Sequence, residues 1–215
     1  MSQADSSDAV SPDDDPAATL TPGRKRMKPG ERRAQILQTL AAMLEQPGAE
    51  RITTASLAAK IEVSEAALYR HFASKAQMFE GLIDFIESSL FTLINQIAER
   101  EGDGADKAAR MVMVLLQFGE KNPGMARVMV GDALVFEHER LHQRMNQLFD
   151  RIESALRQVL RAAAQARHSS TPSADAQVRA SALVALALGQ LQRFTRSGFK
   201  RSPLEHLEPA LALLV

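Results

Sequence analysis

The spacing of apolar residues along the chain predicts a succession of helices. Between residues 32 and 45, apolar side chains recur every three or four positions, which is the period of one face of a helix. The same spacing returns after Thr53, after Ser64 and after Ser74, and Ser and Thr are residues that cap helix N-termini. We therefore expect two short helices and then a long one that ends near Ala98. No stretch alternates with the two-residue period of a strand, so the chain should be all-α.

The second half of the chain also has helical spacing. It predicts helices over residues 111–118, 125–129, 132–165 and 178–199. The Asn122-Pro123-Gly124 triplet should end the first of these, because proline and glycine interrupt helices. Residues 99–106 and the Ser-, Ala- and Pro-rich residues 166–177 should be connections. The last helix carries few charges before Arg193 and should be buried.

Charge is distributed unevenly, although the formal net charge is zero. Residues 1–23 carry five Asp and no Lys or Arg, whereas residues 24–78 carry ten basic side chains and five acidic ones. A basic segment points to a polyanion partner, since the release of counterions from phosphates favours binding. We predict an acidic and then basic tail over 1–28, a helix-turn-helix DNA-binding domain over 29–76 and a larger helical domain over 77–215.

Composition excludes several classes of protein. The chain has no Cys, which removes disulfides, thiol catalysis and Cys-based zinc sites. No apolar stretch approaches the roughly 18 residues that a membrane-spanning helix needs, and the acidic N-terminus is unlike a secretory signal. A cytoplasmic protein without a membrane span is expected. No cluster of catalytic acids, bases or nucleophiles stands out, so an enzyme is not expected.

Residues 53–72 have the spacing of a helix-turn-helix. Two short helices can cross steeply only if a small residue lies at their contact, and Ala58 supplies it. The inner faces would be buried by Leu57, Ile61, Val63 and Leu68. An ordinary helical hairpin with a solvated charged face is the alternative.

The outer surface of this motif carries the candidate DNA contacts. Ala66 and Ala67 are small enough to let the start of the second helix approach base edges. Donors suited to phosphate oxygens follow at Tyr69, His71 and Lys75. The residues that we predict to bind DNA are Arg32, Arg33, Thr53, Thr54, Ser64, Glu65, Ala66, Ala67, Tyr69, Arg70, His71 and Lys75.

The sequence Val-Ser-Glu-Ala-Ala-Leu-Tyr-Arg-His-Phe at residues 63–72, followed by Ser74-Lys75, resembles the recognition helix of TetR-family regulators. Within that family the chain is similar to the nucleoid occlusion factors from about Arg32 to Arg161. The similarity is carried by residues 51–55, 63–72, 118–120, 122–124 and 152–161. It implies a TetR-like fold without a cofactor, in which a three-helix helix-turn-helix domain precedes a larger C-terminal helical dimerisation domain.

The resemblance also implies partners. Such a protein is a homodimer that binds palindromic sites in double-stranded chromosomal DNA. While bound, it antagonises assembly of the division protein FtsZ, so that septa do not close over the nucleoid. The same resemblance places the FtsZ-binding surface near Phe85, Ser89, Leu93, Val114, Lys121 and Asn122. Apolar spacing alone would equally place Phe85 and Val114 in the core.

Two positions depart from the family's pattern. Glu62 stands at the turn where the family usually has glycine. A left-handed conformation there would cost a non-glycine residue about 1 to 2 kcal/mol, so we expect a slightly reshaped turn. Leu93 stands where related proteins carry a basic residue.

A two-fold partner is needed if the chain is to bind two half-sites about one turn of DNA apart. We predict a four-helix dimer seam built from the helices over 132–165 and 178–199. Its residues would be Leu148, Ile152, Leu156, Val159, Leu186 and Leu191, although such an apolar stripe is more often core. A basic cluster at Arg193, Arg196, Lys200 and Arg201 should be solvated rather than membrane-bound.

Two other functions remain open on these patterns. A ligand-responsive repressor of the same fold would enclose a small-molecule pocket in the larger domain, and an inducer would separate its DNA-binding domains. Residues 138–142 match the His-Glu-x-x-His pattern of zinc hydrolases, with His138, Glu139 and His142 in the metal-binding and catalytic positions. Neighbouring charges and the lack of an evident third ligand favour a solvated helix surface without metal.

Overall fold

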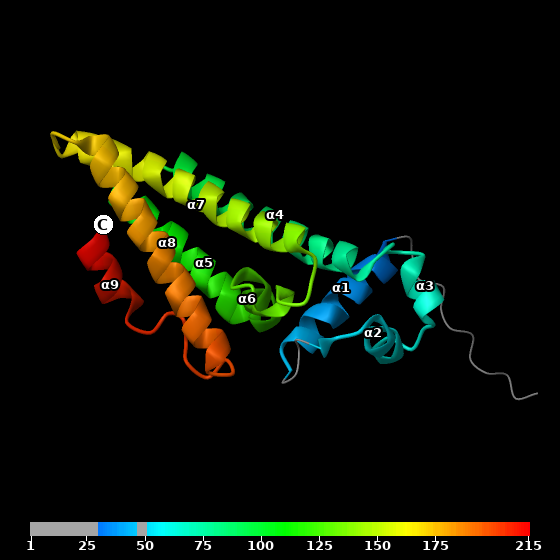
Figure 1. Ribbon diagram of the computed structural model, residues 1–215. Helices are drawn as coiled ribbons and strands as arrows, with labels where there is room; N and C mark the ends of the chain where they lie inside the picture. The colour runs from blue at the N-terminus through cyan, green and yellow to red at the C-terminus, as the bar shows by residue number, and fades with distance from the viewer. Residues whose placement is uncertain (1–29, 47–50) are drawn as a thin grey trace, which may run out of the picture.

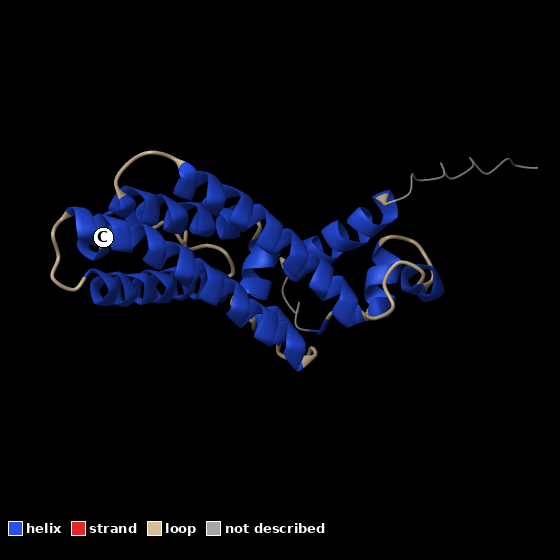
Figure 2. Cartoon of the chain, turned by 90° about the horizontal axis from the view of Figure 1, so that it is seen from above, coloured by secondary structure: helices blue, strands red, loops and turns tan. Residues whose placement is uncertain are grey.

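The computed structural model describes residues 30–46 and 51–215, and every regular element in these ranges is a helix (Figure 1, Figure 2). The α-helices are α1 Glu31–Leu44, α2 Thr54–Lys60, α3 Glu65–Tyr69, α4 Lys75–Glu99, α5 Gly104–Lys121, α6 Pro123–Met129, α7 Glu139–Ala166, α8 Pro172–Arg196 and α9 Leu207–Leu214. A short 3-10 helix, η2 Asp132–Leu134, precedes α7. The all-α prediction is confirmed. The expected tail over 1–28 lies outside the described residues.

Residues 31–46 and 51–76 form a small unit at one end of the molecule, which we call the head (Figure 1). The apolar stripe of α1 is buried there at Ile36, Leu40 and Leu44, as its spacing predicts. Leu57 of α2 and Leu68 of α3 belong to the same core. The predicted helix caps are confirmed, because a backbone N–H in the first turn of α2, α3 and α4 donates to the hydroxyl of Thr53, Ser64 and Ser74, respectively.

The helices from α4 onward form a longer bundle, which we call the body. α4 runs from the head into the body, and α7 lies along it (Figure 1). Arginines of α7 pair with carboxylates of α4: Arg140 Nε lies 2.8 Å from Glu80 Oε1, and Arg144 Nη2 lies 2.6 Å from Asp84 Oδ1. α5 and α8 pack against α7, and the apolar core lies between these helices. None of the described helices is both long and apolar enough to cross a membrane.

The structure corrects several predicted boundaries in the body. The long helix starts at Glu139 rather than at 132, because Gly131 takes a left-handed φ of 83° and the chain turns before α7 begins. Half of the predicted connection 166–177 belongs to α8, which starts at Pro172, and the fixed φ of proline suits the first helical position. α8 is not the last helix. α9 follows it and contains Pro209 in its first turn, where proline is tolerated.

Two glycines let helices approach more closely than a side chain would permit. A Cβ at Gly124 of α6 would lie 2.1 Å from the backbone oxygen of Ala41 in α1. This glycine therefore sets the contact between the head and the body. A Cβ at Gly104 would lie 2.0 Å from the backbone oxygen of Val159, so the start of α5 rests directly on α7.

Candidate nucleic-acid interface

α2, α3 and the turn between them lie in the head, and α3 is at the end of the molecule farthest from the body (Figure 1). α2 ends in a Schellman motif, in which Val63 N–H donates to Ala58 O at 3.0 Å and Glu62 N–H donates to Ala59 O at 3.1 Å. Glu62 has a left-handed φ of 55°. The turn therefore keeps the conformation that favours glycine, and the reshaping considered from the sequence is not observed.

α3 and the residues directly after it present an exposed surface. Ala66, Arg70 and His71 are exposed, and Tyr69 keeps 45% of its surface exposed. Leu68 is fully buried and anchors α3 in the core of the head. Small alanine side chains thus follow Glu65 in the first turn of α3, and hydrogen-bond donors lie at the end of the helix. This arrangement suits an approach to base edges at the start of the helix and to phosphates at its end.

A chain of hydrogen bonds joins α2 to α3. The Thr54 hydroxyl donates to Glu65 Oε2 at 2.6 Å, and the Tyr69 hydroxyl donates to Thr54 Oγ1 at 3.4 Å. All three residues are in the predicted DNA-binding set, and the structure brings them together. The hydrogen bond from Thr54 holds the carboxylate of Glu65 in place at the first position of α3.

Two members of the predicted set form contacts with other residues of the chain. The guanidinium of Arg33 stacks on the ring of Phe72 at 4.0 Å, and its Nη1 donates to His71 O at 2.5 Å. Arg33 therefore supports the chain just beyond α3. Lys75 Nζ lies 2.5 Å from Oε1 of Glu137, a body residue whose side chain is only 10% exposed. Sequence reasoning missed Glu137, because no local pattern connects it to Lys75.

The rest of the predicted set lies at helix starts. Thr53 forms a capping box with Ser56, and Ser64 caps α3. Arg32 donates from Nη1 to Gln35 Oε1 at 2.7 Å in the first turn of α1. Ala67 is half-buried beneath the exposed face of α3.

The residues that the resemblance assigned to FtsZ lie on the α4–α5 hairpin and at its end. Phe85, Ser89 and Leu93 are four residues apart on α4 and share one face. Phe85 is 48% exposed and Leu93 is 40% exposed, so Phe85 is not a core residue. The ring of Phe85 lies 6.2 Å from that of Phe118 on α5, a neighbour that sequence reasoning did not assign to this surface.

The α5 members of this set continue the same surface. Because α5 runs antiparallel to α4, the pairing of Phe85 with Phe118 sets Ser89 opposite Val114, which is half-buried. Lys121 is exposed at the end of α5. Asn122 follows it and donates from Nδ2 to Phe118 O at 2.8 Å.

The residues predicted for the dimer seam are used within the single chain. Leu148, Ile152, Leu156, Val159 and Leu191 are all buried, and Leu186 is half-buried against the same core. Exposing the five buried residues would open the core between α5, α7 and α8, whereas Leu186 keeps part of its surface exposed. Sequence reasoning missed the opposite, outward face of α8, which carries uncharged side chains at Val178, Ser181, Ala182, Ala185, Leu188 and Gly189.

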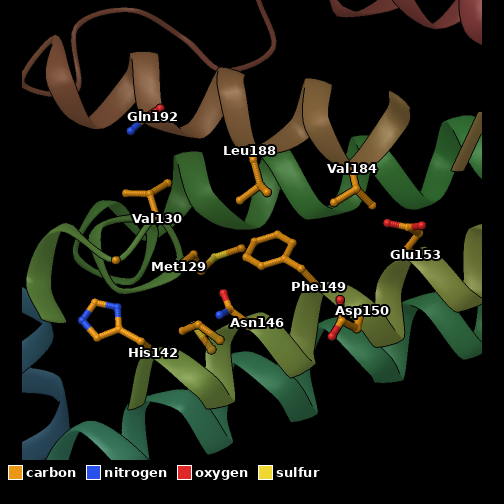
Figure 3. Close-up of a pocket in the computed structure, with 12 residues that line it drawn as sticks. Met129, Val130, His142, Asn146, Phe149, Asp150, Glu153, Val184, Leu188 and Gln192 are labelled. Atoms are coloured by element: carbon orange, nitrogen blue, oxygen red, sulfur yellow. The ribbon is translucent and has the colours of Figure 1, made fainter. Parts of the chain in front are cut away.

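A groove of about 470 Å³ lies between α7, α8 and the end of α6 (Figure 3). Phe149 of α7 points toward Leu188 and Val184 of α8 across its apolar middle, and Asp150 and Glu153 lie at one end. Its size suits a small molecule. The groove is open on the outward side of α7 and α8 rather than enclosed in the body.

The His-Glu-x-x-His pattern does not place two imidazoles on one helical face. His138 precedes α7 as its N-cap, and its Nδ1 accepts the N–H of Arg140 at 3.2 Å. His142 lies within α7, and its Nε2 is 2.8 Å from Leu134 O. Each ring is thus engaged with the backbone. The described residues contain no group of three or more His, Cys, Asp or Glu side chains placed to hold a metal ion.

Known proteins resemble both parts of the chain. A family model described as "Bacterial regulatory proteins, tetR family" matches residues 36–82, and one described as "Tetracyclin repressor-like, C-terminal domain" matches residues 105–215. The "Nucleoid occlusion factor SlmA" of Idiomarina loihiensis is 53% identical over 175 residues, which cover 81% of this chain and 89% of that protein. The protein of the same name from Vibrio cholerae is 51% identical over 184 residues, which cover 85% and 93% of the two chains.

Solved structures show the same fold at low sequence identity. The TetR family transcriptional regulator PfmR from Thermus thermophilus has a TM-score of 0.69 at 21% identity and covers 84% of this chain and 96% of its own. The regulator FadR from Bacillus subtilis, solved in complex with stearoyl-CoA, has a TM-score of 0.67 at 15% identity and covers 85% and 97%. The TetR-like fold prediction is therefore confirmed.

Proposed function

The chain belongs to the family of SlmA nucleoid occlusion factors within the wider TetR family, and we propose that it antagonises FtsZ assembly while bound to palindromic chromosomal sites as a homodimer. The observation that carries the proposal is the sequence identity to the proteins named nucleoid occlusion factor. It is about one half over most of this chain and of the relative, and it is 53% for the protein of Idiomarina loihiensis. In this role the protein works in the cytoplasm, on the nucleoid, and prevents division over unsegregated DNA.

The exposed surface of α3 supports the DNA-binding part of the proposal. In helix-turn-helix proteins the start of the second helix meets base edges in the major groove. Here that start carries Ala66, which leaves room for the backbone to approach. Tyr69 and His71 are exposed donors beside it and would contact phosphates on either side of the groove.

We place the dimer seam on the outward face of α7 and α8. Val178 is 69% exposed there, and Ala185 and Gly189 are small enough for two helices to approach closely. Charged side chains of α7 flank this face, with Asp150 and Glu153 toward the start of the helix and Arg157 and Arg161 toward its end. A two-fold axis between these groups would set the acidic end of one copy beside the basic end of its partner.

The α4 face that carries Phe85 and Leu93 is the surface that we assign to FtsZ. Two large apolar side chains on the same face of a helix remain in solvent, and grouped exposure of this kind marks interaction surfaces. Lys121 adds a positive charge at the end of the neighbouring α5. With Phe85 and Leu93 both apolar, apolar contact would contribute much of the binding at this surface.

Chromosomal occupancy tests the proposal against a ligand-responsive repressor of the same fold. The protein should be cross-linked to DNA in growing cells, and the bound fragments should be sequenced. Many dispersed palindromic sites are expected for a nucleoid occlusion factor. One or two promoter sites, released by a metabolite, would instead support the repressor, and the groove between α7 and α8 would then be the first place to seek the ligand.

A further inference from the structure

The recognition helix starts with an acidic side chain, although its proposed partner is a polyanion. Glu65 is the first helical residue of α3 and is exposed. Between Thr53 and Lys75 the only other carboxylate is that of Glu62, which lies in the turn. A carboxylate near phosphates opposes binding. Its position at the start of α3 therefore points to a specific contact that offsets this repulsion.

The carboxylate of Glu65 is held in place before any DNA arrives. Its Oε2 accepts the Thr54 hydroxyl at 2.6 Å, and Thr54 accepts in turn from the hydroxyl of Tyr69 at 3.4 Å. Thr54 is the first residue of α2, so its own position is fixed by that helix. Among the described residues nothing donates to the second oxygen, Oε1. An anchored side chain loses less conformational entropy on binding than a mobile one, so the free oxygen is preorganised to accept a donor.

We propose that Glu65 is a specificity-determining residue that accepts a hydrogen bond from the exocyclic amino group of a cytosine in the major groove. The proposal rests on the proposed function, because it requires that α3 enters the groove. A carboxylate has only acceptors, and cytosine N4 and adenine N6 are the amino donors in the major groove. Adenine also presents N7, an acceptor beside its N6, which would repel the carboxylate. Cytosine is therefore the base that fits Glu65.

A purely structural role is the competing explanation. Glu65 would then only brace α3 against the start of α2, where a carboxylate also interacts favourably with the helix N-terminus. A brace affects binding to every DNA sequence alike, whereas a base contact affects one position of each half-site. The two roles therefore differ in their dependence on base identity.

In vitro selection from a random duplex library separates the two roles, with the full-length wild type and Glu65→Gln compared in parallel. The wild type should select a palindrome with a cytosine at one position of each half-site. Glutamine still accepts from Thr54 but also donates, and it pairs with adenine through N6 and N7. By competition, the wild type should prefer cytosine over other bases at that position by roughly ten- to a hundredfold, and E65Q should lose this preference. E65Q should select adenine there instead, with no change at the other positions.

Two further variants complete the design. Thr54→Val removes the donor that anchors the carboxylate, so it should keep the cytosine but weaken the discrimination. Lys60→Ala, an exposed change on α2, should weaken binding uniformly and select the wild-type motif. If E65Q selects the same motif as the wild type and binds every DNA sequence less tightly, the proposal is overturned and Glu65 only braces α3. Failure of the wild type to select any palindrome would instead count against the proposed function itself.

Discussion

Replacing Gly124 with alanine should destabilise the protein, because this glycine lets α6 rest directly on α1. The new Cβ would lie 2.1 Å from Ala41 O and 3.0 Å from its carbonyl carbon, and real Cβ atoms essentially never approach within 3.0 Å. Overpacking of this kind costs about 1 to 3 kcal/mol, and the better helix propensity of alanine offsets about 0.5 to 1 kcal/mol. These ranges leave a net loss of at most about 2.5 kcal/mol, and because the new contact is with backbone we expect the upper part of the range, about 1 to 2.5 kcal/mol. This loss corresponds to a fall in Tm of roughly 2 to 10 °C for a chain of this size.

Thermal melts followed by circular dichroism measure this change, and Gly81→Ala is the matched control. Gly81 also lies in a helix that faces α1, but its Cβ would meet side chains rather than backbone, with the movable Cδ1 and Cδ2 of Leu37 at 3.0 and 3.1 Å and Cε1 of Phe72 at 3.5 Å. The control should therefore change Tm little. A G124A protein as stable as the wild type, or an equal loss in G81A, would refute the reasoning. Because the contact joins the head to the body, G124A should also weaken binding to a palindrome more than to a single half-site.

Three further substitutions test other parts of the molecule. Tyr69→Phe should weaken binding to all DNA sequences by a similar factor and leave the salt slope unchanged, because the hydroxyl carries no charge, whereas a changed base preference would contradict its role as a phosphate contact. Glu137→Gln should release Lys75 for phosphates, so that binding becomes tighter and steeper in salt; unchanged binding would show that the ion pair does not compete with DNA. Ala185→Arg should yield monomers by light scattering, while Val135→Arg, exposed elsewhere, should remain dimeric; a dimeric A185R would move the seam off α8.

The head follows closely from local sequence signals. The hydroxyls of Thr53 and Ser64 start their helices where predicted, and the stripe of α1 faces the core. A cap and an apolar stripe depend on residues within one or two turns, so they can be seen in the sequence. The left-handed Glu62 does not follow from the sequence, which favoured a reshaped turn, because the Schellman motif imposes that conformation whatever residue occupies the position.

The body depends on contacts that no local pattern encodes. The stripe through Leu148 and Leu156 shows which face of α7 is apolar, but not whether that face meets the chain's own helices or a partner. The ion pair between Lys75 and Glu137 joins residues that are far apart in the sequence. α9 was not predicted, because the helix over 178–199 is expected to be the last one. Pro209 does not prevent α9, because it lies in the first turn, where it removes no helical hydrogen bond.

Sedimentation of FtsZ polymers tests the central claim most directly. Purified FtsZ with GTP should be pelleted in the presence of this protein alone and of this protein with a chromosomal fragment that it binds. A loss of polymer that grows when the DNA fragment is present is the expected result. Unchanged polymer under conditions where DNA binding has been verified would contradict the division-inhibitor account and favour the ligand-responsive repressor.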